Sequence, residues 1–304
     1  MERIDAELPA LFSYPVKQRN QIIDALFYDV NALTDEEQEK ISPFSDREGM
    51  IIVVPPRNSD GEWRHYENAN RFAIEEGDSI QALALAGVGS SVLGTAALAR
   101  NIADHYGFDV AGIVSGYGVA DVMSEALGGW FFYGTTDQFW REAESLARNL
   151  TSAWEQTLAY LSGSESKISE KSFEKDQREP RTSDIHTLYE VLASCKNLRL
   201  IVGHSKGNLL TSHALRQFAY QRGNADHRYF EDLTIITLGA VVGLHDRFQR
   251  KYQFLGGLDL LGKLNSQLEL PHQSIIGAGH HLNPSIPMHL SVQEVLATVQ
   301  LADA

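Results

Sequence analysis

The sequence contains a single cysteine, Cys195, in 304 residues. An intrachain disulfide therefore cannot form, which is typical of a protein from a reducing compartment, and we expect a cytoplasmic location. No run of about 18 apolar residues occurs, so no membrane-spanning helix is predicted. The first residues also lack the basic-then-apolar order of a signal peptide.

Basic residues are few. Lys and Arg number 26 against 40 Asp and Glu, which gives a net charge of −14. A general nucleic-acid-binding protein would carry a basic surface, so this balance argues against one. It favours a protein with a neutral or cationic ligand, or merely reflects good solubility.

Apolar residues, by contrast, make up 43% of the chain, enough for a sizeable core. Short apolar runs that read as strands alternate with amphipathic helices. This alternation predicts the α/β class, with a doubly wound, mostly parallel sheet and helices on both faces. The predicted strands cover residues 50–54, 80–86, 110–114, 198–202, 233–238, 252–255 and 274–276.

We expect residues 1–304 to form one domain of this class. Residues 1–45 form an N-terminal helical extension, with a helix over 15–33 followed by a solvated acidic stretch at 35–40. Residues 162–184 are rich in Ser, Glu, Lys and Arg, and we interpret them as an exposed, charged insertion.

One stretch combines a strand, a glycine-flanked serine and a helix. Gly203-His204-Ser205-Lys206-Gly207 follows the strand at 198–202, and apolar residues then recur at helical spacing. This is the context of a nucleophile elbow, in which the serine occupies a strained turn and the helix N-terminus faces a developing oxyanion. The alternative is an ordinary glycine-punctuated turn between strand and helix. Ser205 is the predicted nucleophile.

A serine nucleophile needs a base and an acid, and both follow later strands. His280 is the favoured base because it comes directly after the last strand, with His281 next and His289 as a further alternative. Asp259 is the favoured acid and Asp246 its rival. The order serine, aspartate, histidine is the one expected of this architecture. The two adjacent histidines have no Asp, Glu or Cys at ligand spacing, so we predict no metal and no cofactor.

The loop Gly87-Val88-Gly89-Ser90-Ser91 follows the strand at 80–86 and precedes a helix. It is interpreted as the source of a second oxyanion N–H, from Gly89 or Ser90, beside the N–H of Lys206. A dinucleotide-binding loop is the alternative, but the glycine spacing misses G-x-G-x-x-G. A strand-to-helix turn without chemistry is the third interpretation.

Four consecutive aromatic residues lie between glycines at 130–133. They are either core or the wall of an apolar substrate cleft, in which case Trp130, Phe131 and Phe132 contact the substrate. His204 packs beside the elbow and is the remaining candidate for the substrate-binding wall.

These motifs resemble the α/β-hydrolase fold and, within it, the class 3 lipases and their relatives. The resemblance covers roughly residues 80–290 and leaves the N-terminal helix outside. It is carried by the Gly-His-Ser-x-Gly elbow, by Gly-Ala-x-x-Gly at 239–243, by the tyrosine strand that runs from Tyr252 to Asp259, and by Val88-Gly89-Ser90 at the oxyanion loop.

The resemblance implies a serine ester hydrolase that acts on a lipid or another acyl ester. From the charge balance and the short apolar runs we expect no nucleic-acid partner and no membrane span. Contact with a lipid surface and the oligomeric state stay open. An acyltransferase or thioesterase with the same triad is one alternative. A non-catalytic interaction protein that keeps the fold is another.

Overall fold

The computed structural model describes residues 24–42, 44, 47–87, 90–115, 183–222 and 227–302. Contacts between Cα atoms divide the chain into two units, and all of these residues belong to the one made of Tyr14–Tyr117 and Ser183–Ala304. The expected single domain over 1–304 stays a prediction. The aromatic stretch with Trp130, Phe131 and Phe132 lies outside the described residues, and so does most of the expected insertion at 162–184.

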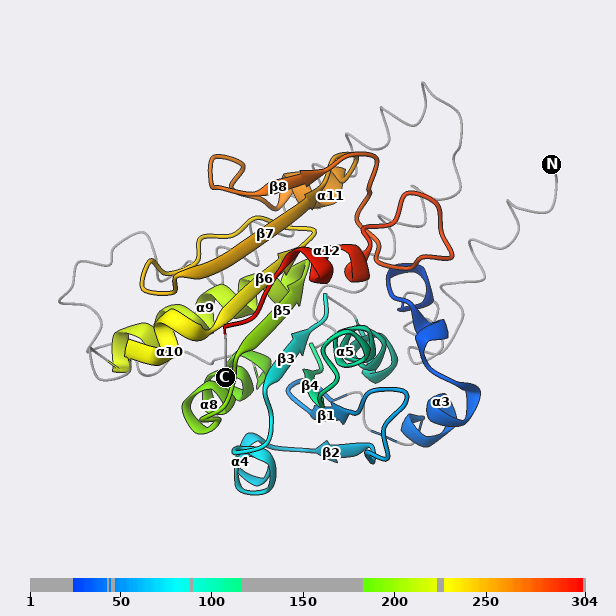
Figure 1. Ribbon diagram of the computed structural model, residues 1–304, viewed down its shortest axis with the longest axis vertical. Coiled ribbons are helices and arrows are strands. Elements are labelled where there is room, and N and C mark those ends of the chain that lie inside the picture. The colour runs from blue at the N-terminus through cyan, green and yellow to red at the C-terminus, as the bar shows by residue number, and fades with distance from the viewer. Residues whose placement is uncertain are drawn as a thin grey trace. The chain divides into compact units, whose positions relative to one another are not determined.

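The described strands form one sheet in the order β2-β1-β4-β3-β5-β6-β7-β8 (Figure 1). β1 pairs antiparallel with β2 and β4, and every other neighbouring pair is parallel. The mostly parallel α/β sheet predicted from the sequence is therefore confirmed. The strands are β1 (Ile51–Val54), β2 (Arg64–Tyr66), β3 (Ala82–Leu85), β4 (Val110–Ile113), β5 (Leu200–His204), β6 (Thr234–Leu238), β7 (Arg250–Gly256) and β8 (Gln273–Ile275).

Helices cover both faces of the sheet. The chain moves in one direction from β3 to β4 and in the other from β5 to β6, so right-handed crossovers place α5 and α9 on opposite faces. α12 packs on α5, and α8 packs on α9 (Figure 1). The described helices are η1 (Val30–Ala32), α3 (Asp35–Ile41), α4 (Ala69–Glu76), α5 (Val92–Tyr106), α8 (Ser183–Ser194), α9 (Lys206–Arg222), α10 (His227–Asp232), α11 (Leu260–Leu264) and α12 (Val292–Thr298).

The central strands are buried over their whole length. Every residue of β3, β4, β5 and β6 is buried, as expected when helices cover both faces of a parallel sheet. This explains why these strands are near-continuous apolar runs in the sequence, without polar alternation. The core therefore lies on both sides of β3, β5 and β6.

The sheet topology brings distant loops to one edge. β5, β6, β7 and β8 are consecutive neighbours and run parallel. The segments that leave their carboxyl ends therefore meet at the same edge of the sheet, where ligands bind in open α/β sheets. Ser205 follows β5, Asp259 follows β7, and His280 follows β8.

Several parts of the fold differ from the sequence-based expectation, among them strand β2 and helix α4, which were not predicted. The acidic stretch at 35–40 is helix α3, which begins with a capping box: Thr34 Oγ1 accepts from Glu37 N, and Glu37 Oε2 accepts from Thr34 N. The T-x-x-E signature of that box was present in the sequence. The short helices α10 and α11 were not predicted, because five or six residues are too few to establish a periodic pattern.

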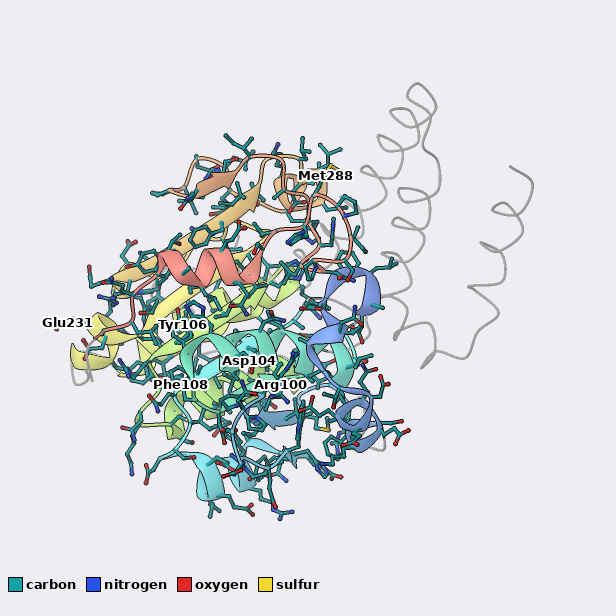
Figure 2. All side chains as sticks on the ribbon, turned by 45° about the vertical axis from the view of Figure 1, so that its right-hand side comes forward. Arg100, Asp104, Tyr106, Phe108, Glu231 and Met288 are labelled. Carbon is teal, nitrogen blue, oxygen red and sulfur yellow. The ribbon has the colours of Figure 1, made fainter. Side chains whose placement is uncertain are left out.

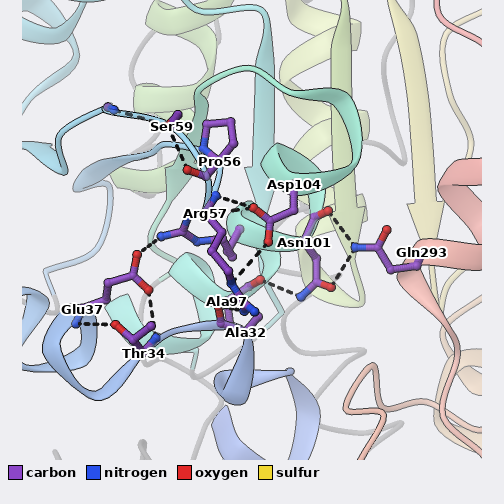
Figure 3. A network of polar contacts seen from close by, with 12 residues as sticks. Ala32, Thr34, Glu37, Pro56, Arg57, Ser59, Ala97, Asn101, Asp104 and Gln293 are labelled. Carbon is purple, nitrogen blue, oxygen red and sulfur yellow. Dashed lines mark hydrogen bonds and ion pairs between the residues drawn. The ribbon is translucent and has the colours of Figure 1, made fainter.

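A polar network ties α3 and α12 to the buried helix α5 (Figure 3). The Arg100 guanidinium, almost fully buried, pairs with Glu37. Arg57 N donates to Asp104 Oδ1 at 2.6 Å, and Gln293 Nε2 donates to the main-chain oxygen of Asn101 at 3.0 Å. These contacts anchor the chain on both sides of α5, including the segment that follows residue 28.

Candidate active site

Ser205 lies in the sharp turn between β5 and α9, with φ of 54°, a left-handed conformation that non-glycine residues rarely adopt. Its backbone N–H donates to the carbonyl oxygen of Leu238 on the neighbouring strand at 3.0 Å. A Cβ atom on Gly207 would lie 2.9 Å from the carbonyl oxygen of Ala86, and one on Gly203 would lie 3.2 Å from the main-chain N of Asn208. Side chains at either position would force the turn apart, so the glycine spacing is a steric requirement.

Three side chains from three different loops meet at Ser205. His280 Nε2 lies 3.0 Å from Ser205 Oγ, and His280 Nδ1 lies 2.8 Å from Asp259 Oδ2. An ionised carboxylate only accepts hydrogen bonds, so Nδ1 carries the proton and Nε2 accepts from the serine hydroxyl. The residues are 8%, 4% and 1% exposed for serine, histidine and aspartate. Ser205 is therefore the most exposed of the three residues.

Asp259 is held by the start of α11. Its Oδ1 atom accepts from the main-chain N of Gly262 at 2.5 Å, so the aspartate caps the helix with one oxygen and meets His280 with the other. The main-chain N of Leu258 donates to the carbonyl oxygen of Ala278 at 2.8 Å, which joins the aspartate loop to the histidine loop. The carboxylate is thereby fixed from both sides.

The structure separates the histidine and aspartate alternatives. His281 turns away from the serine: its Nε2 lies 3.3 Å from the carbonyl oxygen of Ile286, and burial lowers the pKa of its imidazole. His289 is half-buried and does not hydrogen-bond to Ser205, and Asp246 is exposed, with its carboxylate 3.8 Å from Lys251 Nζ. His280 and Asp259, rather than their rivals, are the residues brought to Ser205.

The helix N-terminus behind the serine belongs to Lys206. The first N–H groups of a helix have no intrahelical partner, and they carry the positive end of the helix dipole. The lysine side chain turns toward α8, where its Nζ lies 3.7 Å from Asp184 Oδ2. Asp184 is fully buried, so the expectation of an exposed insertion over 162–184 is wrong at this residue.

The loop after β3 comes into contact with the elbow. A Cβ atom on Gly87 would lie 3.1 Å from the Cβ atom of Ser205. Of the two predicted oxyanion donors in this loop, Gly89 lies outside the described residues. The N–H of Ser90 donates within its own turn to the carbonyl oxygen of Gly87 at 3.3 Å, so it is engaged in this conformation.

The N-terminal segment at 24–28, which sequence reasoning placed outside the site, lies against it. The Phe27 ring meets the His280 ring edge-on, with centroids 5.9 Å apart. The Tyr28 hydroxyl lies 2.9 Å from His204 Nδ1, and the Asp24 carboxylate accepts from Ser91 N at 3.1 Å. Only the helical spacing of Asp24, Phe27 and Tyr28 could have indicated that they share one face.

His204 forms part of this layer beneath the site. Its Nε2 lies 2.9 Å from the carbonyl oxygen of His280, and burial lowers the pKa of its imidazole well below the usual value. The side chain is 1% exposed. The expected packing role agrees with this position, whereas a direct substrate-binding role does not, because both ring nitrogens are already engaged by the protein.

Within the described ranges, no group of three or more His, Cys, Asp or Glu side chains is arranged to hold a metal ion. None of the helices in the described part of the chain is both long and apolar enough to cross a membrane.

The chain matches no protein-family model and no curated protein. The family resemblance of its motifs therefore stays a prediction, and the function is inferred from the geometry of the site.

Proposed function

We propose that this protein is a serine hydrolase of the α/β-hydrolase fold that cleaves carboxylic esters through an acyl-enzyme on Ser205. The observation that carries the proposal is the position of His280, with one ring nitrogen 3.0 Å from the serine hydroxyl and the other 2.8 Å from the Asp259 carboxylate. A serine hydroxyl is a weak nucleophile near neutral pH, and a base at this distance is what activates it.

The reaction proceeds in two halves. Ser205 Oγ attacks the ester carbonyl carbon while His280 Nε2 takes the hydroxyl proton, and Asp259 stabilises the imidazolium that results. The ester C–O bond then breaks, and the imidazolium returns the proton to the departing alcohol. A water molecule attacks the acyl-enzyme, with His280 accepting its proton, and the acid leaves as the serine is reprotonated.

The oxyanion is stabilised by the N–H of Lys206 at the start of α9. A second donor comes from the loop at 87–91, and we assign it to Gly89, because the Ser90 N–H is used within the turn. Preorganised donors of this kind are worth about 10²- to 10³-fold each in turnover. The chemistry needs no cofactor.

An apolar substrate is supported by the surface around the site. Of the eight large hydrophobic side chains that are exposed among the described residues, six lie between positions 258 and 288, on the segments that carry Asp259 and His280. Figure 2 shows one of them, Met288, on the outside of the loop after β8. The six are Leu258, Leu260, Leu264, Leu268, Ile276 and Met288. The aromatic stretch at 130–133 remains our sequence-based candidate for the acyl pocket.

The alternative functions are less well supported. A non-catalytic protein of this fold has no need to hold His280 and Asp259 against Ser205. In a dinucleotide-binding protein, the N-terminus of α5 would receive phosphate. Here the Asp24 carboxylate accepts from Ser91 N at that position. An acyltransferase or thioesterase shares the same site chemistry and differs only in the acceptor. We keep the cytoplasmic location as part of this proposal because the only cysteine has no disulfide partner.

A fluorophosphonate probe followed by a panel of p-nitrophenyl esters tests the proposal. We expect stoichiometric labelling of Ser205 and turnover that rises with acyl length, since each buried methylene contributes about 0.8 kcal/mol. A wild-type protein that neither labels nor turns over any ester contradicts the proposal. Adding an alcohol or thiol acceptor distinguishes transfer from hydrolysis, because a transferase then diverts the acyl group to the acceptor instead of water.

A further inference from the structure

The Tyr28 hydroxyl joins two loops of the site through a chain of buried hydrogen bonds. The main-chain N–H of Gly87 donates to Tyr28 Oη at 2.6 Å, and Tyr28 Oη lies 2.9 Å from His204 Nδ1. His204 Nε2 in turn lies 2.9 Å from the carbonyl oxygen of His280. The chain therefore runs from the loop after β3 to the backbone of the histidine that contacts Ser205.

The two main-chain groups at the ends of this hydrogen-bond series, the Gly87 N–H and the His280 carbonyl oxygen, determine the direction of every hydrogen bond between them. A carbonyl oxygen only accepts, so His204 Nε2 must carry the proton and Nδ1 must be the acceptor. Tyr28 therefore donates its hydroxyl proton to Nδ1 and accepts from the Gly87 N–H with its oxygen. Burial keeps His204 neutral by lowering the pKa of its imidazole, which agrees with this tautomer.

The backbone on either side of Tyr28 makes contacts of the same kind. The Phe27 carbonyl oxygen accepts from the main-chain N of Leu282 at 2.7 Å, and the Ala25 carbonyl oxygen accepts from Asn283 Nδ2 at 2.6 Å. The two partners lie two and three positions after His280 in the sequence. The segment at 24–28 thus holds the histidine loop with its main chain and the loop at 87–91 with its side chains.

We propose that Tyr28 is a positioning residue of the active site, which sets the spacing between the loop at Gly87 and the main chain of His280. The proposal rests on the proposed esterase function. Removing the hydroxyl leaves the Gly87 N–H and His204 Nδ1 buried without a partner, so both loops relax toward other partners. The base and the oxyanion donors then lose their alignment with the ester, while the surface that binds the substrate is unchanged.

Tyr28→Phe tests this, with Tyr66→Phe as the matched control. Both tyrosines are buried, at 3% and 4% exposure, and both use their hydroxyl in an internal hydrogen bond. Tyr66, however, lies on β2, at the end of the sheet opposite to β8. The control therefore reports what the loss of a buried tyrosine hydroxyl does to stability alone.

We expect Tyr28→Phe to lower kcat for p-nitrophenyl acetate and the rate of fluorophosphonate labelling by about 10- to 100-fold, the cost of a small misalignment. KM should change by less than about threefold, since the hydroxyl does not contact the substrate. Tyr66→Phe should keep the wild-type kcat. Wild-type rates in Tyr28→Phe, or equal kinetic losses in both variants, would overturn the proposal.

A double-mutant cycle with His204→Gln tests the chain itself. The glutamine Nε2 can still donate to the His280 carbonyl oxygen, but its Oε1 acceptor does not then lie at the position of His204 Nδ1, so the hydrogen bond from Tyr28 is lost. His204→Gln should therefore slow labelling by a similar factor, and the double variant should be no slower than the slower single one. If the losses in labelling rate multiply in the double variant, Tyr28 and His204 act independently, and the proposed chain of hydrogen bonds is overturned.

The test still decides if Tyr28→Phe does not fold or if the esterase proposal itself fails. If Tyr28→Phe does not fold, His204→Gln alone decides: about a tenfold slower labelling rate supports the proposal, and a wild-type rate overturns it. Failure of the esterase proposal is recognised separately, because the wild-type protein would then not label at all.

Discussion

His280 Nε2 lies 3.0 Å from Ser205 Oγ, although 75 positions separate the two residues in the sequence. They meet because β5 and β8 belong to one parallel sheet, and the loops that leave their carboxyl ends lie at the same edge.

Ser205→Ala should abolish fluorophosphonate labelling and lower ester turnover by about 10³-fold or more, because only oxyanion and binding effects remain. Alanine relieves no clash and adds none, so the thermal unfolding midpoint should stay close to that of the wild type. Mass spectrometry of the labelled protein checks the site directly. Labelling that persists in the variant would assign the nucleophile to another serine.

His280→Ala and His281→Ala should behave differently despite being neighbours. Only His280 contacts the serine, whereas His281 faces the carbonyl oxygen of Ile286. We expect His280→Ala to lose activity by orders of magnitude and His281→Ala to retain most of it, with a modest loss of stability. The measurement is kcat/KM on one short ester. Similar, mild losses in the two variants would remove the base from our mechanism.

Asp259→Asn should lower kcat by about 10³- to 10⁴-fold, since an amide cannot stabilise the imidazolium and favours the wrong tautomer. The fold should survive, because asparagine caps a helix as well as aspartate does. Asp246→Asn is the control: the carboxylate of this exposed aspartate lies 3.8 Å from Lys251 Nζ and away from the serine, so activity should be unchanged. If Asp246→Asn were the inactive variant, the acid would be misassigned.

The buried Asp24 predicts a pH-dependent stability. Burial raises the pKa of Asp24 to about 7, although hydrogen bonds from Ser91 and Ser90 act in the opposite direction. An aspartate in the unfolded chain has a pKa of about 3.9, so between roughly pH 4 and 7 only the folded state holds the proton on Asp24. The contribution of Asp24 to the free energy of unfolding is therefore largest at low pH and falls as the pH rises to 7.

Asp24→Asn removes this titration while keeping a neutral group that resembles the protonated acid. Urea unfolding at pH 5 and pH 8 should show that the variant gains stability relative to the wild type as the pH rises, by a few kcal/mol at most, at about 1.4 kcal/mol per unit of pKa shift. The exposed Asp246→Asn should follow the wild type at both pH values. A wild type and an Asp24→Asn variant that change in parallel would show that Asp24 does not titrate in this range.

The sequence alone determined the central strands, the longer helices and the order of the chemical groups. Parallel strands buried on both faces are apolar runs, and helices on one face repeat every three to four residues, so these patterns are local and readable. The elbow was readable for the same reason: Gly203 and Gly207 are required by steric contacts within a few residues and with the adjoining strand. The order of serine, aspartate and histidine followed from where these residues stood after the strands.

Tertiary structure decided which groups meet. His280 and His281 are neighbours of the same type, and no local pattern distinguishes them. The choice depends on the path of their loop, which is set by the hydrogen bonds from Gly279 N to the Met288 carbonyl oxygen and from Leu290 N to the His281 carbonyl oxygen. The same holds for Tyr28, which is 59 positions from Gly87 and carries no motif. Contacts of that kind arise only when the strands assemble into the sheet and bring distant loops together, so no periodic pattern in the sequence predicts them.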